Sequence, residues 1–112
     1  MARKVELEIE RLRSLFPASI EVSVERSQDG GFFANISTFP GCVTQADSFS
    51  ELIEMVNDAV RTYFEIPEGY LPHMPTYLPP VQVVRRLDVF PVVEKRTNIQ
   101  FRLPSSNEAV AC

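Results

Sequence analysis

One amphipathic helix dominates the hydrophobic pattern of this chain, between residues 48 and 64. Its apolar residues recur three or four positions apart and form a single stripe, which is typical of a helix with one buried face. The stripe consists of Phe49, Leu52, Ile53, Val56, Ala59, Val60, Tyr63 and Phe64. The polar side is predicted to hold Ser50, Glu51, Glu54, Asn57, Asp58, Arg61 and Thr62. An apolar face this wide needs a sheet or another helix to cover it.

Signals at both ends delimit this helix. Ser48 stands at the N-cap position and Glu51 follows three residues later. The Ser48 oxygen can accept from the Glu51 N–H while the Glu51 carboxylate reaches back to the Ser48 N–H, which is a capping box. Asp47 adds negative charge at the positive end of the helix dipole. Pro67 closes the far end.

Two strands are predicted before the helix. Ser19 to Ser27 alternates Ile20, Val22 and Val24 with Glu21, Ser23 and Glu25. The turn that follows contains Asp29, Gly30 and Gly31, and an Asp-Gly pair favours a hairpin in which both central residues take positive φ. Phe32 to Thr38 is the return strand, with either Phe32, Ala34 and Ile36 or Phe33 and Asn35 facing the core.

A second turn and a third, short strand complete the approach to the helix. Phe39, Pro40 and Gly41 predict the turn, and Cys42 to Gln45 the strand. Residues 19 to 64 therefore predict an antiparallel meander of three strands with one face covered by the helix.

The segments on either side are less sharply specified. Residues 3 to 16 fit a helical face through Val5, Ile9, Leu12 and Phe16, but also alternate like a strand from Val5 to Glu10, and helix propensity favours the helix. Pro17 ends this element. We divide the chain into an N-terminal helix or strand (1–17), a core (18–66) and a proline-rich C-terminal extension (67–112).

The extension is predicted to be a connector, because its prolines exclude helix interiors and central strands. Its tyrosines can pack on the domain or on a partner. Residues 81–87 fit a short helix or an edge strand, and 90–93 an extended segment. Alternation over 98–103 predicts a last strand, and a loose tail follows from Pro104.

Composition limits the class of protein. The 112 residues suit one domain, and 45% apolar residues suffice for a modest core. A net charge of −4 disfavours nucleic acid and suits a basic protein partner. The chain has no apolar run that could span a membrane and no secretory signal, so we expect a cytoplasmic protein with reduced thiols at Cys42 and Cys112.

Four short motifs, in order, resemble one known family. They are Asp29-Gly30-Gly31-Phe32, then residues 39–45 (FPGCVTQ), then residues 47–52 (DSFSEL) and Asn57-Asp58-Ala59. With this pattern the segment from Ile20 to Phe64 resembles the HicB-like antitoxin family. The chain has Ala46 where the family often has Gly, and Ser48 where it often has Thr.

The resemblance implies an α+β fold with an antiparallel β-β-β-α-β sheet, a partial ribonuclease-H-like arrangement. It also implies a partner, a HicA-like toxin that cleaves RNA and that the protein binds and blocks. Many family members carry a C-terminal DNA-binding domain, but residues 65–112 show no pair of capped helices. We therefore do not expect this chain to bind DNA directly.

The acidic residues are the candidates for binding that partner. Glu21 and Glu25 lie on the predicted first strand, and Glu51, Glu54 and Asp58 on the polar face of the helix. A solvated surface is the plainer interpretation of these five residues, and an acidic patch for a basic partner the sharper one. A metal-dependent nuclease would need several converging carboxylates, and the predicted last strand contributes none.

No other residue predicts chemistry. His73 stands alone within the proline-rich segment, and Cys42 has no base nearby and is expected to be a buried structural cysteine. Arg85-Arg86 and Lys95-Arg96 are too sparse for a nucleic-acid site. We expect a non-enzymatic protein without catalytic residues, metal or cofactor.

Two main functions remain open at this stage, beside a weak metal-dependent nuclease as a third hypothesis. The first is a HicB-like inhibitor of a HicA-type ribonuclease. In this case we expect the inhibitor to be a homo-oligomer, either a dimer or a tetramer. The alternative is a stand-alone oligomeric scaffold without a toxin, because a short, open edge strand invites pairing between subunits.

Overall fold

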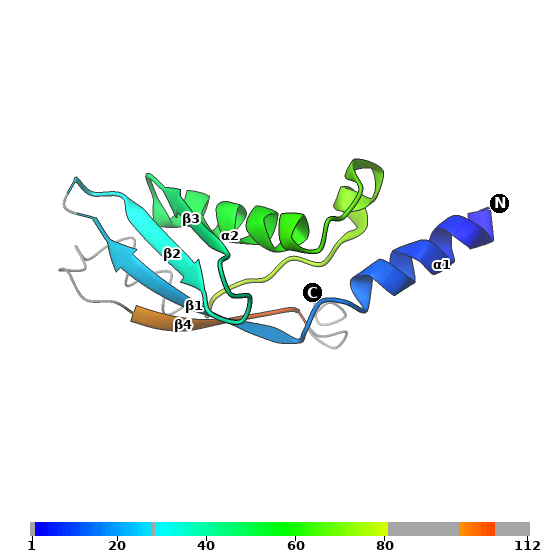
Figure 1. Ribbon diagram of the computed structural model, residues 1–112, viewed down its shortest axis with the longest axis horizontal. Coiled ribbons are helices and arrows are strands. Elements are labelled where there is room, and N and C mark those ends of the chain that lie inside the picture. The colour runs from blue at the N-terminus through cyan, green and yellow to red at the C-terminus, as the bar shows by residue number, and fades with distance from the viewer. Residues whose placement is uncertain (1, 28, 81–96, 105–112) are drawn as a thin grey trace.

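The computed structural model describes residues 2–27, 29–80 and 97–104. Four strands form a single sheet in the order β3-β2-β1-β4, and every neighbouring pair is antiparallel. The helix α2 (Phe49–Tyr63) covers one face of this sheet (Figure 1). The α+β fold class and its antiparallel sheet are confirmed.

The N-terminal element is a helix, α1 (Ala2–Arg13), and it projects beyond the end of the sheet (Figure 1). Of its apolar residues, Leu12 is buried and Ile9 packs against the core. Val5 and Leu7 are instead 48% and 56% exposed. The strand-like alternation at its start therefore comes from a helix that packs only through its C-terminal half.

The central strands β1 (Ser19–Arg26) and β2 (Phe32–Ile36) follow the predicted alternation. Val22 pairs with Ile36 and Val24 with Ala34, and these side chains are buried beneath α2. The choice left open on β2 is thereby settled, because Phe33 is on the other face of the sheet and 41% exposed. β2 ends at Ile36, two residues earlier than expected.

The hairpin between β1 and β2 differs from the expected turn type. Gly30 has φ +96°. The N–H of Ser27 donates to the Gly31 carbonyl at 2.8 Å, and the N–H of Gly30 to the Ser27 carbonyl at 3.1 Å, so a three-residue loop lies between Ser27 and Gly31 in place of a two-residue turn. A glycine of positive φ at the end of a three-residue loop is a common hairpin solution, and it needs no second residue of that conformation.

The next turn has the predicted form. The Cys42 N–H donates to the Phe39 carbonyl at 3.0 Å, and Gly41 has φ +84°. Proline followed by a left-handed glycine is the sequence that a type II turn requires. The turn leads into β3 (Val43–Ala46), which is an edge of the sheet.

Helix α2 begins as predicted at its N-cap. Ser48 Oγ accepts from the Glu51 N–H at 3.1 Å, whereas the reciprocal bond from the Glu51 carboxylate to the Ser48 N–H is not made. Phe49, Leu52, Val56 and Val60 are buried against the sheet. The capping box is therefore half formed, and the serine carries the cap.

Asn57 was wrongly assigned to the polar side of α2. Its side chain is only 4% exposed, because it hydrogen-bonds the backbone of a segment distant in sequence. Helical periodicity gave no sign of this, since an amide among Glu54, Asp58 and Arg61 fits a solvated face.

The end of α2 is closed by an unusual residue. The Ile66 N–H donates to the Arg61 carbonyl and the Glu65 N–H to the Thr62 carbonyl, which together form a Schellman motif. Glu65 occupies its left-handed position with φ 55°. This position is usually glycine, because a Cβ is strained there.

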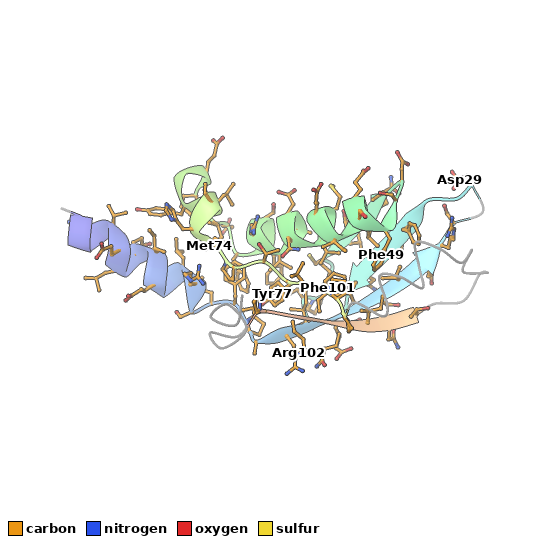
Figure 2. All side chains as sticks on the ribbon, turned by 180° about the vertical axis from the view of Figure 1, so that it is seen from behind. Asp29, Phe49, Met74, Tyr77, Phe101 and Arg102 are labelled. Atoms are coloured by element: carbon orange, nitrogen blue, oxygen red, sulfur yellow. The ribbon has the colours of Figure 1, made fainter. Side chains whose placement is uncertain are left out.

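The proline-rich segment is part of the domain rather than a plain connector. It contains a short 3-10 helix, η1 (Glu68–His73), which includes Pro72, so the expectation that prolines exclude helix here was wrong for this tight form. Met74 and Tyr77 are buried, and Tyr77 and Phe101 lie in the layer between α2 and the sheet (Figure 2).

The last strand, β4 (Thr97–Arg102), lies beside β1, so the chain ends its sheet at the edge opposite β3. Ile99 and Phe101 face the core. Leu78 pairs with Arg102 through two backbone hydrogen bonds of 2.9 Å. The elements expected over 81–87 and 90–93, the basic pairs Arg85-Arg86 and Lys95-Arg96, and Cys112 lie outside the described residues.

Candidate functional site

The five acidic candidates lie on two different sides of the molecule. Glu51, Glu54 and Asp58 are exposed on the side of α2 that faces away from the sheet. Glu21 and Glu25 alternate with buried β1 residues and so occupy the sheet face that α2 does not cover. The structure therefore brings the three helix residues together and separates them from the two strand residues.

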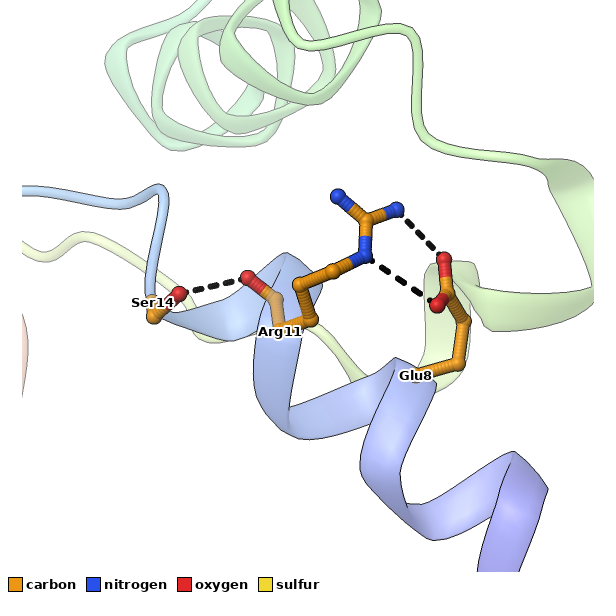
Figure 3. Close-up of polar contacts among 3 residues, drawn as sticks. All are labelled: Glu8, Arg11 and Ser14. Atoms are coloured by element: carbon orange, nitrogen blue, oxygen red, sulfur yellow. Dashed lines mark hydrogen bonds and ion pairs between the residues drawn. The ribbon is translucent and has the colours of Figure 1, made fainter.

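The helix carboxylates are available to a partner. Among the described residues, Glu51, Glu54 and Asp58 take part in no ion pair. Glu8 and Arg11 of α1 do form one, with bonds of 3.1 and 2.5 Å, while the Arg11 carbonyl accepts from Ser14 Oγ (Figure 3). Both α1 side chains are exposed, so this pair contributes little to stability.

The hairpin motif places a further carboxylate near the acidic end of α2. Asp29 lies at the tip of the β1–β2 hairpin (Figure 2), where its carboxylate accepts from the Ser27 hydroxyl. This bond holds the pKa of Asp29 below its usual range. Asp29 shares a hollow of about 370 Å³ with Asp47 and Glu51, and none of the described residues that line it is basic.

The other motif, Pro40-Gly41-Cys42, lines a second hollow. This groove, of about 410 Å³, runs between β3 and α2 and has Met55, Ala59 and Tyr63 on its helix wall. Cys42 is only partly buried there, so the expectation of a buried cysteine was wrong, although desolvation raises the pKa of its thiol. Asp58 is the acidic member of the lining.

Sequence reasoning missed this groove. Ala59 and Tyr63 were assigned to the buried stripe, but Tyr63 is 48% exposed. Its ring packs on Phe39, with 4.7 Å between the centroids, rather than into the sheet. The available signal was the width of the apolar stripe, which exceeds what a short third strand can cover.

Other kinds of site find no support in the part of the chain that the structure describes. It contains no group of three or more His, Cys, Asp or Glu side chains that could hold a metal ion. His73 is exposed at the end of η1, where its carbonyl accepts from Arg13. None of the described helices is long and apolar enough to cross a membrane.

Two curated proteins match part of the chain. A UPF0150 protein from Archaeoglobus fulgidus is 38% identical over 48 residues, which are 43% of this chain and 70% of that relative. The chain belongs to the UPF0150 family. A second UPF0150 protein, from Synechocystis, is 36% identical over 44 residues, 39% of this chain and 56% of the relative.

The matches cover less than half of this UPF0150 chain, and little more than half of the cyanobacterial relative. No family model matches the chain. No solved structure matches it at a significant level.

Proposed function

We propose that this UPF0150 chain is a non-catalytic HicB-like protein that binds and inhibits a HicA-type ribonuclease toxin in the cytoplasm, where the toxin meets its RNA. The support comes from the resemblance of residues 20–64 to HicB-like antitoxins, and from the antiparallel sheet covered by one helix. Membership of the UPF0150 family is compatible with this proposal, because the family name assigns no activity.

One observation carries the proposal. Glu51, Glu54 and Asp58 form an exposed acidic row on α2 that is not neutralised within the described part of the chain. A ribonuclease must present a basic surface to hold RNA phosphates. An acidic row of this kind attracts such a surface, speeds the encounter and competes with RNA for it.

The test uses the small basic protein encoded next to this chain, if the genome holds one, and a labelled RNA. The chain should prevent cleavage at a near-stoichiometric ratio and co-elute with the toxin. Glu51→Gln with Asp58→Asn should weaken inhibition about tenfold at low salt, and less at high salt, because screening removes the attraction.

The matched control removes the same charge from the other face. Glu21→Gln with Glu25→Gln changes the net charge equally, and we expect it to leave inhibition within about twofold. Two results would contradict the proposed function. One is RNA that the basic protein leaves uncut even when this chain is absent, and the other is RNA that is still cleaved when this chain is in excess.

The second candidate, an oligomeric scaffold without a toxin, is favoured by a different observation. Val5 and Leu7 are exposed on the projecting half of α1, where apolar side chains are suited to pack against another subunit. Analytical ultracentrifugation tests it. This candidate predicts a dimer or tetramer that Leu7→Glu shifts to a smaller species and that inhibits no toxin, and a monomeric chain would contradict it.

A further inference from the structure

The outer strand β3 has a backbone edge that nothing in the described part of the chain covers. The Ile36 N–H donates to the Cys42 carbonyl at 2.9 Å, and Thr44 and Ala46 follow in the same register opposite Ala34 and Phe32. Hydrogen-bonded pairs alternate in an antiparallel ladder, so the N–H and C=O groups of Val43 and Gln45 point away from β2. Such an edge is a template for an added strand.

The groove between β3 and α2 lies along this edge, on its inner side. Met55, Ala59 and Tyr63 form the helix wall, and Cys42 and Thr44 the strand wall. Val43 pairs with Asn35, so its side chain is on the other face of the sheet, where it is 52% exposed. An added strand would direct alternate side chains toward α2, as every strand of this sheet does, and the groove would receive the apolar ones.

The opposite end of β3 is acidic. Gln45 and Ala46 line the hollow that also holds Asp29, Asp47 and Glu51. Among the described residues, neither this hollow nor the groove has a lysine, arginine or histidine in its lining, and the groove adds Asp58. The edge is therefore apolar where the groove presents Met55 and Ala59, and negatively charged at its Ala46 end, so it suits a segment of the complementary character.

We propose that the β3 edge binds an extended segment of a basic partner protein as a fifth strand of the sheet. An apolar side chain of that segment enters the groove beside Met55 and Ala59. A lysine or arginine about four residues away, which points to the same face, reaches the acidic hollow, since a strand advances about 3.3 Å per residue. The inference deepens the proposed function by naming where the partner attaches. It rests on that function for the basic character of the partner.

A peptide tests the site without any toxin. The probe is a fluorescein-labelled ten-residue peptide in which valine and threonine alternate over six residues and two lysines follow. We expect saturable binding in fluorescence anisotropy. Replacing both lysines by glutamate should weaken binding at least about tenfold, and N-methylation of alternate backbone nitrogens should abolish it, because an added strand must donate those hydrogen bonds.

Variants of the full chain locate the binding. Gln45→Pro removes an outward N–H that no strand uses, so the sheet keeps its ladder, as circular dichroism should show. Ala59→Lys places a charge in the groove. Each should lower peptide affinity about tenfold or more, while Glu68→Gln, an exposed residue of η1 in neither lining, should leave it within about twofold.

The outcomes separate this inference from the proposed function. If Gln45→Pro inhibits the toxin as well as the unaltered chain does, the function stands and the edge is not the attachment point. Peptide binding that is lost in Gln45→Pro supports the edge even where no toxin is inhibited. If the unaltered chain is a dimer and the Gln45→Pro variant is a monomer, a second copy of the chain occupies the edge, and the proposal is overturned.

Discussion

The side-chain amide of Asn57 pairs with the backbone of Tyr77 as one strand residue pairs with another. Its Nδ2 donates to the Tyr77 carbonyl at 2.9 Å, and its Oδ1 accepts from the Tyr77 N–H at 2.6 Å. Nδ2 also donates to the Ile53 carbonyl at 2.9 Å. Only an amide offers a donor and an acceptor side by side, so a carboxylate or an alkyl group of similar size cannot replace it.

Asn57→Asp should therefore lower the free energy of unfolding by about 3 kcal/mol at pH 7, because a buried carbonyl loses its donor and faces a buried carboxylate. Urea denaturation measures the change. The neighbouring Asp58→Asn, on the exposed side of α2, serves as control and should stay within about 0.5 kcal/mol. Equal effects of the two substitutions would contradict the assigned role of Asn57.

The buried hydroxyl of Tyr77 predicts a pH dependence. It donates to the Pro17 carbonyl at 2.5 Å, and desolvation raises the pKa of Tyr77 to about 12 from an ordinary 10.0. Since the folded state favours the neutral phenol, its contribution is complete below pH 10 and is lost as the pH rises toward 12. We expect a loss of about 2 kcal/mol over this range.

Tyr77→Phe is the matched control for that experiment. It should cost about 1 kcal/mol near neutral pH through the lost hydrogen bond, and its stability should fall much less between pH 10 and 12. Denaturant titrations at several alkaline pH values compare the two proteins. Parallel curves for both would show that another group causes the alkaline loss.

Glu65 is a site where the chain can be stabilised. Its positive φ of 55° strains any residue with a Cβ, so Glu65→Gly should raise the free energy of unfolding by about 0.5–1 kcal/mol. Thermal denaturation would show a higher midpoint. Glu65→Ala, which keeps the Cβ, should bring no such gain, and a gain of the same size would point to charge instead of backbone strain.

The Ser48 cap gives a fourth prediction. Ser48→Ala removes the acceptor of the Glu51 N–H and should cost about 1 kcal/mol. Glu51→Gln should cost little by comparison, because its carboxylate does not complete the capping box. A larger loss for Glu51→Gln than for Ser48→Ala in urea denaturation would reverse this assignment.

The features predicted correctly from sequence share one property, namely short range. The alternation in β1, the Pro40-Gly41 turn and the Ser48 cap each depend on residues within a few positions of one another. Asn57 and Tyr77 are twenty residues apart, and nothing local shows that one binds the other. Likewise, Glu65 occupies a position where local rules expect glycine.

The acidic candidates show the same limit. Sequence identified Glu21 and Glu51 equally well as surface residues of a strand and a helix. Sequence could not show that Glu21 lies on the sheet face away from α2 while Glu51 lies on α2 itself, because both occupy polar positions of amphipathic elements. The groove was missed for a related reason, since the coverage of Ala59 and Tyr63 depends on the length of β3.

The contacts of residues 77 and 78 bear on how far the chain can be shortened. Tyr77 joins Pro17 to Asn57, and Leu78 bonds to Arg102, so four stretches of the sequence meet there. A fragment ending at residue 66 would lack both this junction and β4, leaving one side of β1 without its ladder. The smallest autonomous unit is therefore larger than the segment that carries the family motifs, and truncation to that segment should yield an unstable polypeptide.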